Sequence, residues 1–382
     1  MTLHKGCALV LTLLSFTTAG RAEQTNAPAA PATAIQVEDI ARGLQNPWGM
    51  QFLPDGRMLV TERPGLMRII TKNGKISEPV TGLPNVVQGG QAGLFDVLLG
   101  KDFAKNGIIY FSYAEPRGLF KNGTSVALAK LKLEGDGGSI TDGVVIFRQE
   151  PAVASRAHFG GRLAWAQDGT LFVTTGERYS ERDSAQDLTN HLGKIIRLND
   201  DGSLPKDNPF YAQSSKRNEI WSYGHRNLQG AAINPATGDL WTTEHAAKGG
   251  DELNVTRAGK NYGWPVITWG TDYDGSKIGE GTTKDGMEQP AYYWNPSIGT
   301  SGLAFYDGEL FKSWKGNILA GGLAGNTLER LVLDGEKVIA VEHLLTDRAE
   351  RIRDVRVAAD GAVWVLTDDD TNGKLLRLTP KP

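Results

Sequence analysis

The stretch Gln167-Asp-Gly-Thr-Leu-Phe-Val-Thr-Thr175 joins a tight-turn signal to a run of apolar and β-branched residues. Asp168-Gly169 favours a hairpin turn, because glycine accepts the positive φ that such turns require. A second extended segment, Gly193-Lys-Ile-Ile-Arg-Leu198, follows after a polar break. This combination predicts a pair of antiparallel β-strands.

The same unit recurs along the chain. Clear copies are Pro54-Asp-Gly-Arg-Met-Leu-Val-Thr61 with 66–70 and Ala359-Asp-Gly-Ala-Val-Trp-Val-Leu-Thr367 with 374–378, and weaker copies are 107–113, 237–243, and 316–320 with 329–333. A β-sandwich would not explain six copies of one unit, whereas radial repetition of small sheets would. The sequence therefore predicts an all-β fold, a six-bladed β-propeller of four-stranded antiparallel blades. A strand at 35–42 is expected to close the ring by joining the last blade.

Composition limits the class of protein. Of the 382 residues, 40% are hydrophobic and 22% are charged, which is typical of a soluble globular chain. The formal net charge of -3 is too small to favour nucleic acid or an anionic membrane as a partner. We assign residues 36–382 to a single propeller domain.

The first residues are typical of a secretory signal. His4 and Lys5 precede the apolar segment 8–16, and Gly20-Arg-Ala22 provides small residues before a cleavage point at Glu23. The apolar run is shorter than the roughly 20 residues that span a bilayer, so we expect no membrane insertion. We predict a signal peptide at 1–22, an Ala- and Pro-rich flexible linker at 23–35, and a periplasmic or secreted protein.

The cysteine content limits the chemistry that the mature chain can perform. The only cysteine, Cys7, lies in the predicted signal, so the mature chain would have no disulfide and no cysteine nucleophile.

Four segments are rich in Gly, Asp, Asn and Lys: 114–125, 178–192, 199–218 and 264–295. They are predicted to be loops around one face of the propeller.

Three segments contain residues suited to chemistry. His158 stands beside the Gly160-Gly161 pair, which lets a ligand approach the backbone, and a neutral imidazole is a natural general base. Glu177, at the end of the same hairpin, could orient the ring. The simpler alternatives are a structural histidine and a solvated carboxylate.

Two of these segments are cationic. Arg351 and Arg353 are two residues apart, so on a strand they share a face, where an anion could lie between them. Arg226-Asn227 adds a third cation and an amide. Together they indicate a site for a rigid ligand with several carboxylates. Surface pairing of the two arginines with Asp347 and Glu350 is the alternative.

The segment Glu244-His-Ala-Ala-Lys-Gly-Gly-Asp-Glu252 is a glycine-containing acidic loop. Its carbonyls and carboxylates are the oxygen ligands that Ca²⁺ prefers, although a plain acidic turn would have the same composition. No nucleotide-phosphate loop, dinucleotide glycine pattern, Gly-x-Ser-x-Gly elbow or paired-histidine zinc motif occurs, which argues against an oxidoreductase that holds a nucleotide.

In order and spacing, these segments resemble the PQQ-dependent soluble aldose sugar dehydrogenases, relatives of soluble quinoprotein glucose dehydrogenase. The resemblance runs from about Asn46-Pro-Trp-Gly49 to Leu378. Its most specific parts are Gly90-Gln-Ala-Gly-Leu94, His158-Phe-Gly-Gly-Arg-Leu163, Tyr223-Gly-His-Arg-Asn227, Asp251-Glu-Leu-Asn254, Asn261-Tyr-Gly-Trp-Pro265 and Arg351-Ile-Arg-Asp354. The family fold is a six-bladed propeller, which agrees with the repeat count.

The resemblance implies PQQ- and calcium-dependent oxidation of aldoses to lactones. It places His158 as the base that takes the anomeric proton while hydride passes to the C5 carbonyl of PQQ, with Glu177 orienting the ring and Arg226 stabilising the developing charge. The residues implied to contact PQQ are Gln91, Arg226, Asn227, Tyr273, Ala324, Arg351 and Arg353. The carbonyls of Ala246 and Ala247 would hold the Ca²⁺ that bridges to PQQ, and Glu252 with the Tyr262 carbonyl would form a second, structural Ca²⁺ site.

The sequence departs from the family at three positions. Ala246-Ala247 replaces Gly-Pro, which puts loop rigidity in doubt. Ala324 stands where the glucose dehydrogenase branch has a lysine near PQQ, which should weaken the hold on the cofactor. Glu177 replaces Asp and is one methylene longer.

Two other functions stay open at this stage. One is a calcium-dependent propeller lactonase or related hydrolase, and the other is a non-catalytic sugar-binding propeller. The natural sugar and the external electron acceptor are not identified, and both a monomer and a homodimer are compatible with the sequence.

Overall fold

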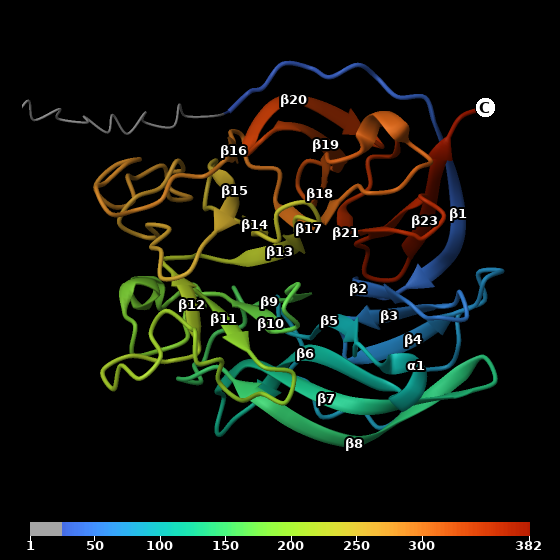
Figure 1. Ribbon diagram of the computed structural model, residues 1–382, viewed down its shortest axis with the longest axis horizontal. Coiled ribbons are helices and arrows are strands. Elements are labelled where there is room, and N and C mark those ends of the chain that lie inside the picture. The colour runs from blue at the N-terminus through green and yellow to red at the C-terminus, as the bar shows by residue number, and fades with distance from the viewer. Residues whose placement is uncertain (1–24) are drawn as a thin grey trace, which may run out of the picture.

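The computed structural model of the protein describes residues 25–382, so the predicted signal at 1–22 and Cys7 lie outside the described residues. Small antiparallel sheets surround a common axis (Figure 1). The first strand of each sheet lies beside the first strand of the next, in the order β2, β5, β9, β13, β17, β21 and back to β2. The fold is therefore the predicted six-bladed β-propeller.

The blades follow the order of the chain. Blade 1 contains β2 (Pro47–Phe52), β3 (Met58–Glu62) and β4 (Leu66–Ile70); blade 2 contains β5 (Leu94–Leu99), β6 (Ile108–Pro116), β7 (Asn122–Glu134) and β8 (Gly137–Arg148); blade 3 contains β9 (Gly160–Trp165), β10 (Leu171–Thr175), β11 (Lys194–Leu198) and β12 (Ile220–Tyr223). Blade 4 contains β13 (Leu228–Ile233), β14 (Leu240–Glu244), β15 (Asp251–Thr256) and β16 (Tyr292–Trp294); blade 5 contains β17 (Thr300–Phe305), β18 (Ile318–Gly322), β19 (Thr327–Asp334) and β20 (Lys337–Leu344); blade 6 contains β21 (Ile352–Val357), β22 (Val363–Thr367), β23 (Gly373–Pro380) and β1 (Ile35–Leu44). The described helices are short: α1 (Phe103–Asn106) and the 3₁₀ turns η1 (Arg182–Gln186), η2 (Lys312–Trp314) and η3 (Thr346–Arg348).

Blade 1 has three named strands, whereas the other five blades have four. The segment after β4 takes the outer position without forming a regular strand. The Ser77 N–H donates to the Ile69 carbonyl at 2.9 Å, and the Val80 N–H donates to the Met67 carbonyl at 2.8 Å. The outer edge of β4 is thus covered in part.

The ring closes through the N-terminal strand, as predicted. β1 pairs antiparallel with β23, with Val37 opposite Leu378, so the two ends of the propeller share blade 6. β1 is thus the outermost strand of blade 6 and covers the outer edge of β23.

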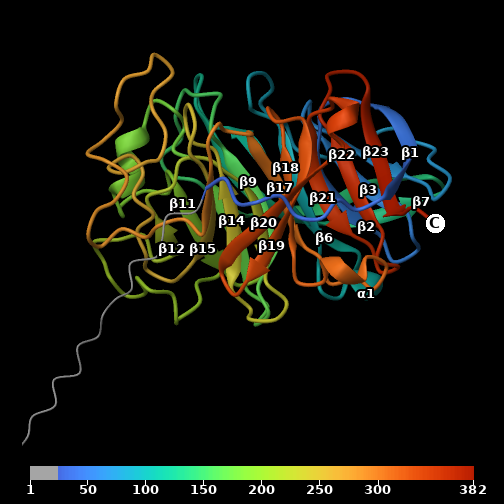
Figure 2. The same ribbon diagram turned by 90° about the horizontal axis from the view of Figure 1, so that it is seen from above.

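The segment expected to be a flexible linker lies along blade 5 and passes over β20 before entering β1, as Figure 1 and Figure 2 both show. The Val341 N–H donates to the Pro28 carbonyl at 2.9 Å, and the Thr33 hydroxyl donates to Glu342 at 3.1 Å. The outer strand β20 has a free edge that these contacts cover. The Ala/Pro composition gave no sign of partners that lie about 300 residues away in the sequence.

The core lies between the blades. Residues of β10 alternate: Leu171 and Val173 pack toward blade 2, and Phe172 packs toward blade 4. Each of the six interfaces between neighbouring blades has its own buried apolar cluster. Strands buried on both faces explain why the repeats read as nearly continuous apolar runs.

The prediction of a loop at 114–125 is wrong. β6 continues to Pro116 and β7 begins at Asn122, and Glu115 pairs with Gly123, so only 117–121 form the connection. Polar residues at the end of a projecting hairpin have the same composition as a loop. The segments 178–192 and 199–218 do connect strands, and 264–295 is a long connection that ends in β16. Among residues 25–382, no helix is both long and apolar enough to cross a membrane.

Candidate active site

One face of the propeller collects the candidate residues, because in each blade the first strand begins and the second strand ends there. His158 precedes β9 and Glu177 follows β10. Arg226 and Asn227 precede β13, and Ala246 follows β14. In blade 6, Arg351 directly precedes β21, which carries Arg353, and Asp368 directly follows β22. Strand ends therefore bring together residues that are distant in sequence.

His158 and Glu177 form a buried pair. The His158 Nδ1 lies 2.7 Å from the Glu177 Oε1, and the two side chains are 5% and 1% exposed. A carboxylate accepts a hydrogen bond from the Nδ1–H, which leaves Nε2 as the unprotonated nitrogen of the neutral ring. Burial lowers the pKa of His158. The hydrogen bond to Glu177 raises it by a smaller amount, and the charge of Arg226 lowers it again. The imidazole is therefore held in the neutral form that a general base requires.

The backbone around this pair is closely packed. The main-chain N–H of His158 donates to the Gln91 Oε1 at 2.7 Å, which holds the Gln91 side chain against the main chain of the base. At Gly176, a Cβ atom would lie 2.0 Å from the His158 carbonyl oxygen. Only glycine permits this approach, so Gly176 lets the end of β10 bring Glu177 to the imidazole.

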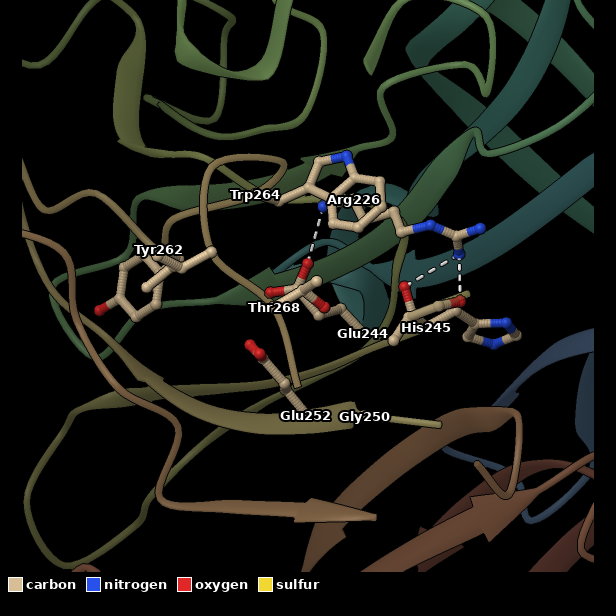
Figure 3. A pocket seen from close by; sticks show the side chains of 10 residues that line it. Arg226, Glu244, His245, Gly250, Glu252, Tyr262, Trp264 and Thr268 are labelled. Atoms are coloured by element: carbon tan, nitrogen blue, oxygen red, sulfur yellow. Dashed lines mark hydrogen bonds between the residues drawn. The ribbon is translucent and has the colours of Figure 1, made fainter. Parts of the chain in front are cut away.

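Arg226 lines a pocket with Glu244 and His245, and its side chain extends toward the His245 main chain (Figure 3). Its Nη1 donates to the His245 carbonyl at 3.1 Å and also to the Ala246 carbonyl, and its Nη2 donates to the Tyr273 hydroxyl at 3.3 Å. The guanidinium lies 5.2 Å from the Trp264 ring centroid. Arg226 is buried, so its charge acts through a medium with little solvent screening.

Several polar atoms at this face have no hydrogen-bond partner within residues 25–382. They are the Asn227 Nδ2, the Arg226 Nε, the Glu177 Oε2, the Thr300 Oγ1 and the Arg353 Nε, all of them buried. Each such group costs roughly 1–3 kcal/mol when it is left unsatisfied. Their concentration at the strand ends that carry His158 indicates a polar ligand site, since a bound ligand would satisfy them.

Arg351 and Arg353 share a face, as predicted, and converge on a carboxylate. Their Nη2 atoms lie 3.2 and 2.9 Å from the Asp368 Oδ2. The alternative pairing with Asp347 and Glu350 does not occur, because Glu350 is bound by Arg348 and Lys374. Two guanidinium groups on a single carboxylate leave a net positive charge for a further anion.

The other predicted residue in this part of the site, Ala324, is exposed in the turn between β18 and β19. It follows Leu323, whose carbonyl accepts a hydrogen bond from the Arg351 Nη1 at 3.3 Å. A lysine at this position would stand beside Arg351. Alanine leaves that place open.

His245 connects the two cationic groups. Burial lowers its pKa to about 4, Asp251 opposes this shift, and the charges of Arg226 and Arg353 add to it. Both cations therefore lie within electrostatic range of the same imidazole. The Arg226 Nη1 also donates to the His245 carbonyl, so Arg226 and Arg353 act on one part of this face.

The proposed bridging calcium site offers few ligands from the protein alone. The Ala246 N–H donates to the Asp251 Oδ1 at 2.9 Å, which fixes the loop, while the Ala246 carbonyl accepts from Arg226. Ala247 is half-buried against Trp264 and Ile278. Two carbonyl oxygens are a fraction of the 6–8 that Ca²⁺ takes. These residues fit Ca²⁺ only if a ligand with oxygen donors completes the shell.

The residues predicted for the second calcium site fit the ion better. The Glu252 side chain is half-buried and points into a small cavity lined by Glu244, Tyr262 and Thr268 (Figure 3). The Asn254 Nδ2 donates to the Glu252 Oε2 at 3.0 Å. Burial, and then the charge of Glu244, raise the pKa of Glu252 to about 8. Two neighbouring acids beside a polar cavity match the hard-oxygen preference of Ca²⁺.

This acid pair predicts how stability depends on pH. The pKa of Glu252 is raised from 4.5 to about 8, so between these values the folded protein binds a proton that the unfolded chain has released. Without Ca²⁺, the melting temperature of the wild type should therefore fall relative to that of Glu252→Gln as the pH rises from about 5 to about 8. Buried groups whose lowered pKa acts in the opposite direction, such as His245 and Lys194, are common to both proteins. Added Ca²⁺ should raise the wild-type melting temperature again at the upper pH, because the ion binds the folded form.

Melting curves by circular dichroism, with chelator or with Ca²⁺ at each pH, measure both effects. Glu252→Gln should lose this pH-dependent contribution and the response to Ca²⁺ together. A difference in melting temperature between wild type and Glu252→Gln that stays constant, or that grows in favour of the wild type, over this range in chelator would contradict the assignment.

Sequence reasoning missed four residues of this face. Arg178 and Tyr179 follow Glu177, Asp368 follows β22, and Trp264 begins the long connection of blade 4. The Tyr179 ring lies edge-on to the His158 ring at 5.4 Å, and the residue is 56% exposed. Three of the four stand at the end of a second strand, and this position could have identified them.

Comparison with known proteins agrees with this geometry. Residues 44–377 match the Glucose / Sorbosone dehydrogenase family. The chain is 44% identical over 356 residues to aldose sugar dehydrogenase YliI of Escherichia coli K12, covering 92% of this chain and 95% of that protein. The chain therefore belongs to the Glucose / Sorbosone dehydrogenase family.

Solved structures show the same relationship. The apo form of the soluble aldose sugar dehydrogenase of Escherichia coli superposes with a TM-score of 0.87 at 43% identity, covering 91% of this chain and all of that one. The PQQ-bound form of an aldose sugar dehydrogenase from Streptomyces coelicolor gives 0.75 at 26% identity, covering 91% and 100%.

Proposed function

We propose that the protein is a PQQ- and Ca²⁺-dependent dehydrogenase that oxidises aldose sugars at the anomeric carbon to lactones. One observation carries the proposal: the buried His158–Glu177 pair opens on a basic pocket whose buried donors lack partners among the described residues. A base beside an anion site fits an oxidation in which a sugar meets an anionic cofactor. The names of the relatives support the same activity.

The residues present fit PQQ, which is rigid and carries several carboxylates. Arg351 and Arg353 would hold carboxylates, since Asp368 neutralises only one of their two charges. Gln91, Arg226, Asn227 and Tyr273 would contact the quinone end, where the free Asn227 Nδ2 supplies a donor. When bound, PQQ supplies the two-electron oxidant that the amino-acid side chains lack.

The protein side chains manage the proton and the charge. The His158 Nε2 accepts the proton of the anomeric hydroxyl as the carbon loses its hydrogen with two electrons and the carbonyl forms. Glu177 stabilises the imidazolium that results, through the bond to Nδ1. Arg226 faces the same pocket as Glu177, with its Nε 4.0 Å from the Glu177 Oε1, and stabilises negative charge that develops on the oxidant.

Calcium would act at two places. The Ala246 and Ala247 carbonyls would hold the ion that bridges to PQQ, and this requires the Ala246 carbonyl to use a lone pair not taken by Arg226. Glu252 and the Tyr262 carbonyl would hold the structural ion. We further propose a periplasmic or secreted location and an external acceptor that reoxidises the cofactor.

Reconstitution tests the proposal. Apoprotein is incubated with PQQ and Ca²⁺, and dye reduction is measured with glucose and other aldoses while the product is identified as a lactone. The proposed function predicts dye reduction that requires the sugar and both additions. Lactone hydrolysis without PQQ would indicate a hydrolase, and sugar binding without dye reduction would indicate a binding protein; either would contradict the proposal.

A further inference from the structure

A buried cation lies behind the base. Arg178 follows Glu177 in the chain, and its side chain is fully buried. Among residues 25–382, its guanidinium donates only to oxygen atoms of neutral groups: the Ala157 carbonyl at 3.0 Å, the Asn122 carbonyl at 3.1 Å, the Asn122 Oδ1 at 2.7 Å, and the Ser155 carbonyl. A buried charge costs free energy to desolvate, so a chain that places one here must fix it with several hydrogen bonds.

These contacts hold the chain on both sides of His158. The Ser155 and Ala157 carbonyls precede the base, and the guanidinium stacks on the following Phe159 ring at 3.8 Å. Asn122 belongs to β7 of blade 2. Arg178 thus ties the segment that carries the base to the neighbouring blade.

The segment needs this support because its backbone is strained. His158 has a φ of 49°, Arg178 a φ of 68° and Tyr179 a φ of 67°. Residues with side chains rarely adopt such values, and they persist where surrounding contacts fix them. The Arg178 N–H also donates to the His158 carbonyl at 3.3 Å, so the two strained turns are joined directly.

The same residue acts on the charge of the base. Burial lowers the pKa of Arg178 to about 9, so the group is still a cation at neutral pH. The charged groups near the His158 ring are the Glu177 carboxylate and the Arg226 and Arg178 guanidiniums; Glu177 favours protonation of the ring, whereas burial and both cations oppose it. The uncharged Tyr179 ring contacts the imidazole edge-on.

We propose that Arg178 is a positioning residue for the base, because it fixes the main chain on both sides of His158 and keeps a positive charge behind the imidazole. This inference rests on the proposed function, since it concerns the base of the proposed reaction. It also goes beyond that function, because the Arg178 side chain is buried away from the pocket and acts through His158.

Arg178→Met, which removes the charge and the hydrogen bonds, tests the role. With PQQ and Ca²⁺ saturating, kcat should fall roughly 10–100-fold, because a small displacement of a catalytic group costs up to about that much. The affinity for PQQ should change little. The acid limb of the pH profile of kcat/KM should move to higher pH, because a cation that opposes protonation of His158 is gone. Arg178→Lys keeps the charge but not the planar guanidinium that donates to several oxygen atoms at once. It should therefore return the acid limb close to its wild-type pH while kcat stays below the wild-type value.

Arg197→Met is the matched control. Arg197 is also a buried arginine of blade 3, and its guanidinium lies over an aromatic ring, that of Trp221, at 5.2 Å. It binds Asp168 and Asp207 at the opposite end of the blade. This variant should lower the melting temperature without changing kcat or the acid limb.

The outcomes separate the inference from the proposed function. If wild type is active and a folded Arg178→Met variant keeps its kcat and its pH profile, the positioning role is wrong. If wild type itself reduces no dye, the proposed function fails first. Should Arg178→Met not fold, Asn122→Ala removes one acceptor of the guanidinium and should lower kcat by about 3–10-fold; an unchanged kcat in that variant would also overturn the inference.

Discussion

Replacing His158 by alanine is expected to lower kcat for aldose oxidation by roughly 10²–10⁴-fold, the usual contribution of a positioned general base. The ring is buried, neutral and held through Nδ1 by Glu177, so the lost group is the Nε2 that accepts the proton. PQQ should still bind, because the cationic residues of the pocket are untouched. The measurement is steady-state dye reduction at saturating PQQ, Ca²⁺ and sugar.

Glu177→Gln serves as the matched variant for this prediction. The amide keeps the shape of the side chain but no longer stabilises an imidazolium, so kcat should fall by less than in His158→Ala. A His158→Ala protein that folds, binds PQQ and turns over sugar at nearly the wild-type rate would remove His158 from the mechanism.

The second large effect concerns the arginines, which should separate into two roles. Arg226→Ala should lose about 10²–10³-fold in kcat even at saturating PQQ, because its charge acts on the transition state. Arg353→Ala should instead weaken PQQ binding by about ten- to a hundredfold, since charge-assisted hydrogen bonds contribute about 1.5–3 kcal/mol each. Saturating PQQ should restore much of its rate.

Arg353 is buried and also binds Gln229 and Asp368, so its removal could unfold the site. Arg351→Ala is the control for this, because the Arg351 side chain is 49% exposed and shares the same carboxylate. It should weaken PQQ binding with little loss of melting temperature. PQQ titrations of the three apoproteins decide the matter: wild-type affinity in both Arg353→Ala and Arg351→Ala would show that the pair does not bind the cofactor.

Much of the fold was predictable because it is encoded locally. Each Asp-Gly turn with its flanking apolar runs specifies a hairpin between neighbouring residues, as at Asp168-Gly169 and Asp360-Gly361. The ring closure by β1 was also predicted. The absence of a regular fourth strand in blade 1 was not predicted. Residues 76–80 form only a few hydrogen bonds to β4, and the repeated sequence unit contains no information about the last strand of a blade.

The site was predictable in part. His158, Glu177 and Arg226 could be named from the sequence because they flank recognisable strands, and the structure brings them together. The contacts of two further arginines could not be predicted: Asp368 meets Arg353 within blade 6, and Asn122 reaches Arg178 from another blade. Such contacts depend on how strand ends and neighbouring blades pack, which local propensity does not encode.

The most direct test of the central claim is a single turnover without an electron acceptor. Apoprotein loaded with stoichiometric PQQ and Ca²⁺ is mixed anaerobically with glucose, while the absorbance of the cofactor and the formation of lactone are followed. The account predicts that bound PQQ is reduced and an equal amount of lactone forms, and that both fail to appear on the same time scale in the His158→Ala protein. PQQ that does not bind saturably, or that stays oxidised beside excess aldose in the wild-type protein, would contradict it.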